Sequence, residues 1–520
     1  MQVKSNSHIC HAIFTMAFLG LFGIAATAAT RPNLLLITVD DMNANSVGVF
    51  GSSMPDTTPN IDRIATEGLR FQRAHVQVAN CTPSRNVMWS GRYPHSNGVE
   101  GFYQVKEPGY DTLSDLMQQA GYFTAIRHKV NGSTPFFPYD WDMVLDYSSD
   151  EGDRLKHKDP DSYGFSTTQA IQAAKSAGKP FALLVNIADP HVPFFGLNKA
   201  YEVEEDAFSP SRIYRAEEVS VPGFLTDDPV IRQELSHYYS SVRRADDAVG
   251  QIMNALEKSG EADSTLVMFL SDHGMPFPFA KTQLYHHSTW TPLIFRWPDV
   301  IEKNSIDEQH MVSAVDILPT LLTAVGAPVP SGIQGRSFLP LLRGEAQANR
   351  DWVIKEYNEN ASGQRRPMRA VQDSRFLYIF NPWSDGSRAM ASATLATSTY
   401  KRMEELAKND EKLAARLALL KHRVVEELYD IENDPDCLVN LISDPIYQKE
   451  IQKLRSVLKE WMRETHDPAL HAFTNRTDQK ALMAYMTEQE TLVQKRRHWK
   501  RTIRDSLKKK QAGNPAKAPL

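Results

Sequence analysis

Apolar runs of strand length recur through the first part of the chain and constrain its fold more than any other feature. Five of them have the composition of strands buried on both faces: NLLLITV (33–39), FTAI (123–126), FALLVNIA (181–188), TLVMFL (265–270) and PLIFRW (292–297). Segments with helical periodicity lie between them, as at 112–120 and 231–258. Strands buried on both faces occur where helices cover both sides of a mostly parallel sheet. The pattern therefore predicts an α/β fold with such a sheet sandwiched by helices.

The character of the chain changes near residues 340–350. Beyond this boundary the sequence predicts one long charged helix at 402–424, a further helix at about 445–464, and shorter strands at 352–357, 375–381 and 425–431. These elements predict a smaller C-terminal α+β subdomain. We therefore expect four parts: a signal peptide at 1–29, a main domain at 30–345, the subdomain at 346–470 and a helical basic tail at 471–520.

Composition and charge exclude several classes of protein. Hydrophobic residues make up 42% of the 520 residues and charged residues 23%, which excludes a mostly disordered chain. The net charge of −5 excludes a global basic field, so no nucleic-acid partner is expected. Three cysteines in a chain of this length exclude a disulfide framework.

The two ends of the chain carry signals of their own. An apolar run at 12–26, too short for a comfortable membrane span, is followed by the small residues of 26–29. This pattern predicts a secretory signal peptide, with an uncleaved anchor as the alternative. We expect an exported protein, periplasmic or extracellular, without a stable membrane span. At the other end, 495–510 holds nine lysines and arginines and one aspartate, which favours a contact with an anionic polymer or a solvated terminal helix.

Polar residues stand where the predicted strands end. The endings are Asp40-Asp41, His128-Lys129, Asp189-Pro190-His191 and Asp272-His273. In open α/β sheets, ligands bind at the carboxyl ends of the strands, so we expect these side chains to gather at one edge. Asp40, Asp41 and Asp272 offer three carboxylates to a hard divalent cation such as Ca²⁺ or Mg²⁺. Taken alone, the aspartate pair is equally consistent with helix capping.

The most specific signal is Cys81-Thr82-Pro83-Ser84-Arg85, which precedes a helical pattern. This segment resembles the signature of the sulfatase family, in which the cysteine is oxidised after translation to formylglycine (3-oxoalanine). Three further segments resemble the heparan N-sulfatase (N-sulfoglucosamine sulfohydrolase) branch of that family: SDHGMPFP (271–278), PMRAVQ (367–372) and WMRETHDP (461–468). The resemblance covers about residues 31–470 and implies an alkaline phosphatase-like fold.

The resemblance also implies an activity and the residues that carry it. The activity is hydrolysis of a sulfate ester or sulfamate on a sulfated saccharide, after a formylglycine-generating enzyme has converted Cys81. The implied metal is Ca²⁺, with Mg²⁺ as the alternative, and its ligands are Asp40, Asp41, Cys81, Asp272 and His273. The implied catalytic residues are Cys81, Arg85, Lys129, His191 and Lys281. In this scheme Arg85 stabilises the hydrated formylglycine, the two lysines bind sulfate, and His191 is the general acid or a sulfate contact.

Two positions depart from the family pattern. Lys281 stands where the N-sulfatase branch carries an arginine. A lysine cannot form the bidentate contact with an anion that an arginine forms. Asn131 stands where the family often has a second histidine after Lys129. His128 could substitute for it, although it lies on the other side of Lys129. The acid–base assignment therefore stays open at this stage.

Other side chains near the motifs carry two interpretations each. Four charged residues around PMRAVQ either border the substrate pocket or are surface charge: Glu359, Arg365, Arg366 and Arg369. Three residues after Lys281 either line the pocket or are structural: Tyr285, His286 and His287.

Two interpretations of the whole chain compete with an active sulfatase. One is a phosphoryl or phosphonyl hydrolase with the same metal-bearing edge, and the other is a saccharide-binding relative whose Cys81 is never converted.

Overall fold

The computed structural model describes residues 31–105, 107–136, 140–146 and 155–512, with side chains as far as residue 496. The expected signal peptide at 1–29 lies outside the described residues, as do residues 513–520 of the expected tail. Within the described part of the chain, no helix is both long enough and apolar enough to cross a membrane.

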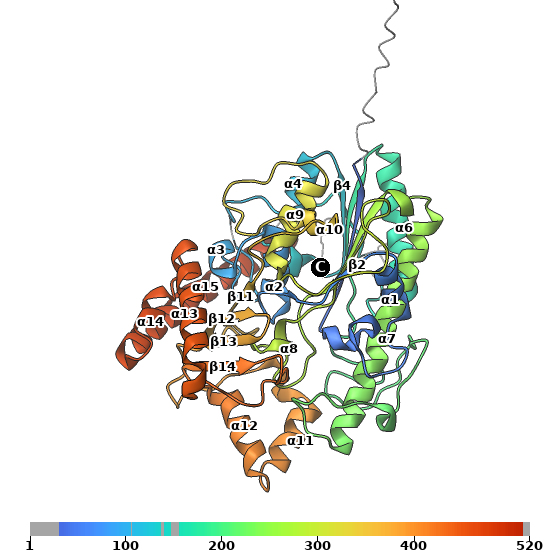
Figure 1. The fold of residues 1–520 in the computed structure, drawn as a ribbon. Coiled ribbons are helices and arrows are strands. Elements are labelled where there is room, and N and C mark those ends of the chain that lie inside the picture. Colours follow the sequence, from blue (N-terminus) through green and yellow to red (C-terminus); the bar gives the residue numbers. More distant parts are fainter. Residues whose placement is uncertain (1–30, 106, 137–139, 147–154, 513–520) are drawn as a thin grey trace, which may run out of the picture. The chain divides into compact units, whose positions relative to one another are not determined.

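An eight-stranded sheet forms the centre of the fold (Figure 1), in the order β5-β4-β6-β1-β7-β8-β2-β9. Its strands are β1 (Asn33–Val39), β2 (Leu69–Phe71), β4 (Phe123–Arg127), β5 (Met143–Val144), β6 (Phe181–Asn186), β7 (Thr265–Ser271), β8 (Leu293–Arg296) and β9 (Ser305–Asp307). The five strands from β5 to β7 run parallel, whereas β8 runs antiparallel to both β7 and β2. The prediction of a mostly parallel sheet is therefore confirmed.

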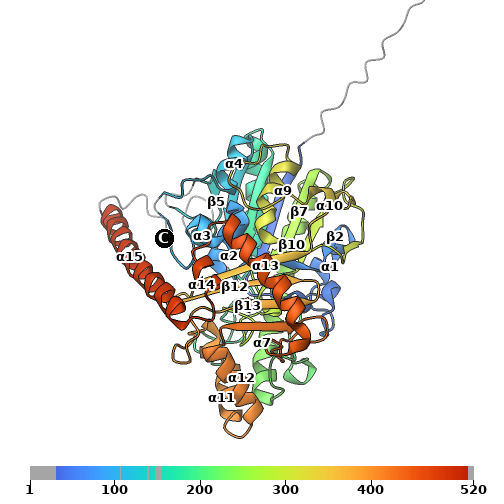
Figure 2. The ribbon, with the colours of Figure 1, turned by 60° about the vertical axis from the view of Figure 1, so that its left-hand side comes forward.

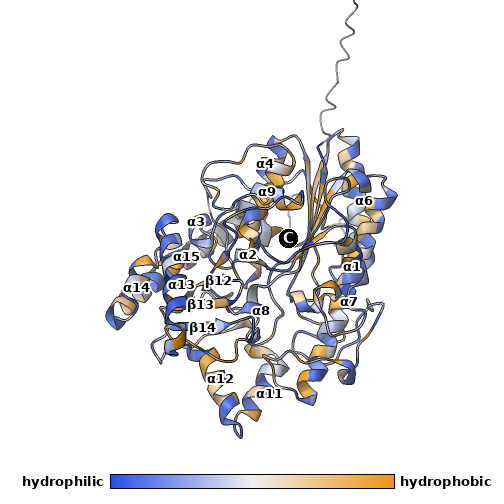
Figure 3. Cartoon of the chain, viewed as in Figure 1, coloured by the Kyte–Doolittle hydropathy of each residue, from blue (hydrophilic) through white to orange (hydrophobic). Residues whose placement is uncertain are grey.

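Both faces of this sheet are covered, as the apolar runs predict. In β1, Leu35 and Ile37 belong to one hydrophobic core, whereas Leu34 and Leu36 belong to a second. This alternation follows from the period of two along a strand. Figures 1 and 3 show the helices on the two sides, with their polar faces outward. The first core includes α1 (Pro59–Thr66), α6 (Pro160–Ser176) and α7 (Pro229–Lys258), and the second includes α4 (Leu113–Gln119), α9 (Ile317–Ala324) and α10 (Leu339–Leu342).

The C-terminal part is built on a four-stranded antiparallel sheet in the order β11-β12-β13-β14. Its strands are β11 (Trp352–Glu359), β12 (Arg365–Asp373), β13 (Phe376–Phe380) and β14 (Glu426–Asp430). Helix α13 (Gln448–Glu464) packs on β12 and β13 (Figure 2), and Leu454 and Leu458 on this helix are buried. Three of the strands and α13 agree with the sequence expectation. The sequence pattern does not predict β12, because three arginines interrupt its apolar residues.

The expected single helix at 402–424 is wrong, because the segment forms two helices, α11 (Ser398–Leu406) and α12 (Glu411–His422). The break has a local cause. The Asp410 carboxylate accepts hydrogen bonds from the backbone N–H groups of Lys412 and Leu413, both at 3.0 Å. A side chain that satisfies these otherwise unpaired donors starts a new helix.

The remaining elements are short, apart from the last helix. They are β3 (Ala74–His75), β10 (Val312–Ser313), α2 (Cys81–Ser90), α3 (Pro94–Asn97), α5 (Val130–Ser133), α8 (His286–Thr289), α14 (Leu470–Thr474) and α15 (Gln479–Ala512). Helix α15 contains most of the expected basic tail. Its buried residues Leu482, Met486 and Val493 attach its first half to the rest of the chain.

Candidate active site

The strand endings gather at one edge of the main sheet, as predicted. The backbone N–H of Asp40, after β1, donates to the carbonyl of Asp189, after β6, at 3.2 Å. The backbone N–H of Asp272, after β7, donates to the carbonyl of Val39 at 3.1 Å. Neighbouring parallel strands thus place their terminal residues side by side. This edge brings together carboxylates that are far apart in the sequence.

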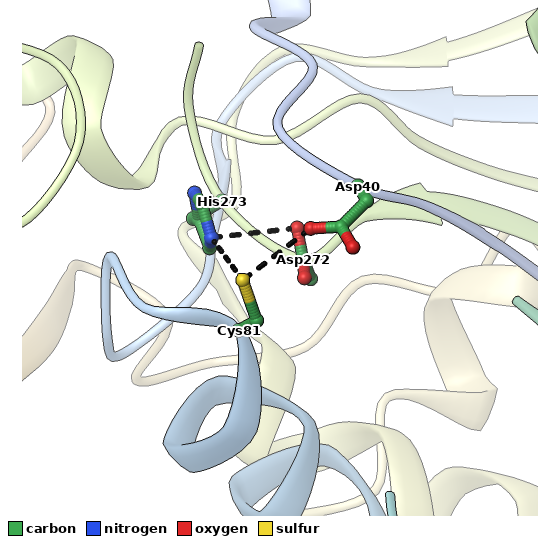
Figure 4. Close-up of side chains that lie close together, drawn as sticks. All are labelled: Asp40, Cys81, Asp272 and His273. Atoms are coloured by element: carbon green, nitrogen blue, oxygen red, sulfur yellow. Dashed lines mark hydrogen bonds and ion pairs between the residues drawn. The ribbon is translucent and has the colours of Figure 1, made fainter. Parts of the chain in front are cut away.

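Helix α2 brings Cys81 into this group (Figure 4). The Cys81 Sγ atom lies 3.4 Å from Asp40 Oδ1 and 3.3 Å from His273 Nε2. The preceding residue, Asn80, is extended, and its side-chain amide donates to the Glu359 carbonyl at 3.1 Å. Cys81 is therefore the first residue of a helix whose N-terminus faces the site. A helix N-terminus favours anionic groups placed before it.

The five residues predicted as metal ligands come together. Ligand atoms of Asp40, Cys81, Asp272 and His273 all lie within 4.8 Å of one another, and His273 Nε2 lies 3.1 Å from Asp41 Oδ1. All five side chains are buried. Burial, followed by the charge of Asp40, raises the pKa of the Cys81 thiol well above its ordinary value. Burial, followed by Asp40, likewise raises the pKa of Asp272.

The donor set fits a divalent cation. His273 Nδ1 lies 3.0 Å from the Gly274 carbonyl, which only accepts, so this nitrogen carries the proton. The other ring nitrogen, Nε2, faces the carboxylate of Asp41 at 3.1 Å. Two electron-rich atoms this close require a cation or a proton between them. A metal-binding histidine typically donates its other ring N–H to a carbonyl in this way, and carboxylate oxygens suit Ca²⁺ or Mg²⁺.

Arg85 is held rigidly beneath this group. One of its terminal nitrogens lies 2.9 Å from Asp272 Oδ2, and the other donates to Thr38 Oγ1 at 2.6 Å and to Asn186 Oδ1 at 2.5 Å. Its side chain is completely buried. Sequence reasoning missed Thr38 and Asn186. Their signal was available, because each is a polar residue inside an otherwise apolar strand.

Two lysines meet the aspartate pair. Lys281 Nζ lies 2.7 Å from both carboxylate oxygens of Asp41, and Lys129 Nζ forms an ion pair with Asp40. Burial alone raises the pKa of Asp40, but the charges of Lys129, His191 and Arg85 outweigh it and hold that pKa well below its ordinary value. The predicted cations therefore all lie at the predicted carboxylates.

His191 stands at the outer side of the site. Its Nδ1 donates to the Val192 carbonyl at 2.7 Å, so Nε2, which lies 3.9 Å from Asp41 Oδ2, is the nitrogen that can take up a proton. Burial lowers the pKa of this imidazole.

Two residues that the sequence analysis did not single out bind the neighbouring Asp189 carboxylate. They are Lys158, at 2.6 Å, and Arg244, at 2.7 Å.

The departure at Asn131 has a structural counterpart. Asn131 lies exposed in the short helix α5. His128 and Lys129 both have left-handed backbone angles, with φ of 58° and 50°, so the chain turns sharply after β4. While Lys129 reaches Asp40, the His128 ring packs against His157, with 4.0 Å between ring centroids.

The residues around PMRAVQ are not surface charge, so that interpretation is wrong. All four are buried, and Arg365, Arg366 and Arg369 lie on β12, where the antiparallel sheet and α15 enclose them. Arg369 pairs with Asp467 at 2.5 Å, and Arg365 pairs with Glu100 at 2.9 Å.

Tyr285, His286 and His287 are enclosed mainly by the C-terminal part of the chain. His286 is within hydrogen-bonding distance of Gln372 on β12, at 3.3 Å, and His287 pairs with Asp436 at 3.2 Å. The guanidinium of Arg423 lies over the Tyr285 ring, 4.3 Å from its centroid. These contacts fit the structural interpretation of the three residues.

Comparison with known proteins agrees with this geometry. Residues 32–327 match the sulfatase family model, and residues 272–385 match a model described as N-sulphoglucosamine sulphohydrolase, C-terminal. Human N-sulphoglucosamine sulphohydrolase is 28% identical over 483 residues, covering 84% of this chain and 91% of that protein.

Two solved structures share the fold. A protein solved in complex with its substrate D-glucosamine-2-N,6-O-disulfate has a TM-score of 0.62 at 21% identity, covering 84% of this chain and 98% of the other. The phosphonate monoester hydrolase of Agrobacterium radiobacter has a TM-score of 0.58 at 18% identity, covering 84% and 96%. The alkaline phosphatase-like architecture is thereby confirmed. Since the sulfatase model spans more than half of the residues, this chain belongs to the sulfatase family of sulfuric ester hydrolases.

Proposed function

We propose that this protein removes a sulfate group from a sulfated saccharide, with the sulfamate of N-sulfoglucosamine as the leading substrate. The observation that carries the proposal is the position of Cys81. It opens helix α2 inside the C-x-P-x-R segment and lies within 3.4 Å of Asp40 and His273. The similarity to the human N-sulphoglucosamine enzyme, and the C-terminal family match, support the sulfamate.

Two groups that the chain acquires would complete the site. Asp40, Asp41, Asp272, His273 and an oxygen at position 81 would hold a calcium ion, which supplies Lewis-acid polarisation of the sulfate when bound. Hydrated formylglycine at position 81 would supply two geminal hydroxyls, one to serve as the nucleophile toward sulfur and one whose ionisation would allow sulfate to leave with return of the aldehyde. A maturation enzyme that generates formylglycine is therefore a required partner.

The chain's own residues bind and orient the substrate. Lys129 and Lys281 lie beside Asp40 and Asp41, where the sulfate would bind. Their ammonium groups would contact the sulfonyl oxygens and offset the negative charge of these oxygens. Arg85 fixes the orientation of Asp272. His191 would take up at Nε2 the proton that the attacking hydroxyl loses, and would pass it to the leaving nitrogen or oxygen as the S–N or S–O bond breaks. We propose the periplasm or the exterior as the location of this activity.

The test uses protein matured by a co-expressed formylglycine-generating enzyme, with Cys81→Ala as its control. Conversion is checked by a mass loss of about 18 Da at position 81, because the thiol becomes an aldehyde. Sulfate release is measured from N-sulfoglucosamine and from O-sulfated glucosamine in calcium buffer, and again after chelation. We expect release from the N-sulfated sugar, its loss in Cys81→Ala, and its loss on chelation with recovery when calcium returns.

The other outcomes decide between the alternatives. Release only from O-sulfated sugar would keep the mechanism and reject the sulfamate. Phosphate or phosphonate release without sulfate release would favour the second candidate, which the fold shared with a phosphonate monoester hydrolase supports. An unconverted Cys81 in the natural host would favour the inactive saccharide-binding relative.

A further inference from the structure

A cleft of about 940 Å³ opens beside the active site. One wall comes from residues 128–129 and 156–158, and the other from residues 188, 191–193, 197–200 and 204–208. Lys129 and His191 belong both to the catalytic group and to the lining of this cleft. The cleft is therefore continuous with the place where a leaving group would depart. Its volume lies at the upper end of the range typical of ligand pockets, about 300–1,000 Å³.

The first wall is held rigidly in place. Lys158 Nζ donates to Asp189 Oδ1 at 2.6 Å and to the His191 carbonyl at 2.7 Å. The hydroxyls of Ser162 and Tyr163 donate to the carbonyls of Lys156 and His157, each at 2.8 Å. The segment 156–158 is thus attached on one side to the His191 loop and on the other to helix α6. A charge on this segment has a fixed position relative to the catalytic residues.

Most charges on this wall are already neutralised, with one exception. Lys129 pairs with Asp40, and Lys158 pairs with Asp189. Lys156 is exposed and has no ion-pair partner among the residues that the structure describes. The packed rings of His128 and His157 line the cleft beside it. This wall therefore presents one available ammonium next to two imidazoles.

The opposite wall has a different character. Val192, Pro193 and Leu197 contribute apolar surface. Asp206 is neutralised by Arg244 at 2.7 Å, whereas Glu204 and Glu205 are exposed and would repel an anion. Lys199 lies on the same wall and partly offsets them. Among the described residues that line the cleft, those on the wall of Lys156 include no carboxylate, so an anionic group would be directed to that wall.

From this arrangement we propose that the cleft binds the saccharide beyond the scissile sulfate, and that Lys156 binds a second anionic group of that saccharide. The inference rests on the proposed function and names the substrate class more closely. The second group is a sulfate or a carboxylate, since an ammonium recognises both. The His128–His157 pair would orient that group, while the apolar wall contacts a sugar face.

The test measures binding in the Cys81→Ala background, where no turnover occurs. The probes are N-sulfoglucosamine, its 6-O-sulfated form, and a disaccharide of N-sulfoglucosamine linked to glucuronate. We expect Lys156→Ala to weaken binding of at least one doubly charged probe about tenfold, the effect of losing a charge-assisted contact, and to leave N-sulfoglucosamine unchanged. If Lys156→Ala weakens binding of the 6-O-sulfated probe alone, the group that Lys156 binds is a sulfate. If it weakens binding of the disaccharide alone, that group is a carboxylate.

Two further variants sharpen the test. Lys179→Ala removes an exposed lysine that does not line the cleft and should change nothing. Glu205→Gln should strengthen binding of the same probe about twofold, because it removes a repulsive charge from the opposite wall. An equal effect of Lys156→Ala on all three probes, or binding of none of them, would overturn the inference.

Hydrolysis by the matured protein separates this inference from the proposed function. Sulfate release that does not depend on Lys156 for any probe would keep the function and reject the second-anion site. Binding that depends on Lys156, without hydrolysis by protein shown to be converted at position 81, would keep the site and reject the function.

Discussion

At the scale of single residues, the candidate active site is a set of oppositely charged pairs. Each aspartate of the pair after β1 meets one lysine, and Lys281 contacts both oxygens of Asp41 at 2.7 Å. We predict that Lys281→Met lowers kcat/KM of the matured protein about a hundredfold, the effect typical of removing one donor from a developing anion. Lys281→Arg, which keeps the charge, should retain activity within about tenfold. Steady-state kinetics with melting curves check this, and a Lys281→Met protein that matches the wild type would refute the role.

At the scale of elements, a buried charge network connects the short helix α3 to the C-terminal sheet. His95 Nδ1 lies 2.7 Å from Glu356 on β11, and its Nε2 lies 3.1 Å from the Thr465 carbonyl, just after α13. Both partners only accept, so both nitrogens carry protons. Burial lowers the pKa of His95, but the charge and hydrogen bond of Glu356 outweigh it and raise that pKa to about 9.

This raised pKa sets a window in which the protein loses stability. The folded state holds the proton more tightly than the unfolded state, whose histidine titrates near 6.5. The contribution is therefore complete below pH 6.5 and is lost as the pH rises through 9. We expect a loss of roughly 3 kcal/mol in the free energy of unfolding across this window. Denaturant unfolding from pH 6 to 10 measures it, and His95→Gln should flatten the profile. An equally steep profile in His95→Gln would assign the loss to other groups.

At the scale of the whole molecule, α15 joins the C-terminal end to the loop after α3. Gln489 accepts a hydrogen bond from Arg365 at 2.6 Å, and Arg496 pairs with Glu100. Beyond this anchor the sequence stays strongly basic to Lys510. We predict that deleting 497–520 lowers the salt concentration at which the protein elutes from a heparin column, because fewer cations contact the polyanion. Hydrolysis of a monosaccharide substrate should not change. A full-length variant with glutamine at the basic positions of 497–510 should elute early too, and unchanged elution of both would reject polyanion binding.

Some of these features could be predicted from the sequence because their causes are local. The apolar runs predict buried strands, and polar pairs after them mark the edge where ligands bind. The C-x-P-S-R segment points to the sulfatase family, and the family match over residues 32–327 confirms it. Four of the five strands predicted from the sequence, β1, β4, β6 and β7, run parallel, and the predicted ligands lie where these strands end.

Other features were decided only by the tertiary structure, because they depend on residues distant in the chain. Asp41 and Lys281 are 240 positions apart, and nothing local indicates that they touch. Strand β12 is stabilised although arginines interrupt it, because Asp467 and Glu100 pair with those arginines in the folded chain. The break at Asp410 came from a single capping side chain that helical periodicity does not reveal. The sequence by itself thus determined which chemistry the chain carries and at which end of the sheet. Packing decided which charges meet, since burial penalises any charge without a partner and the partner can come from anywhere in the chain.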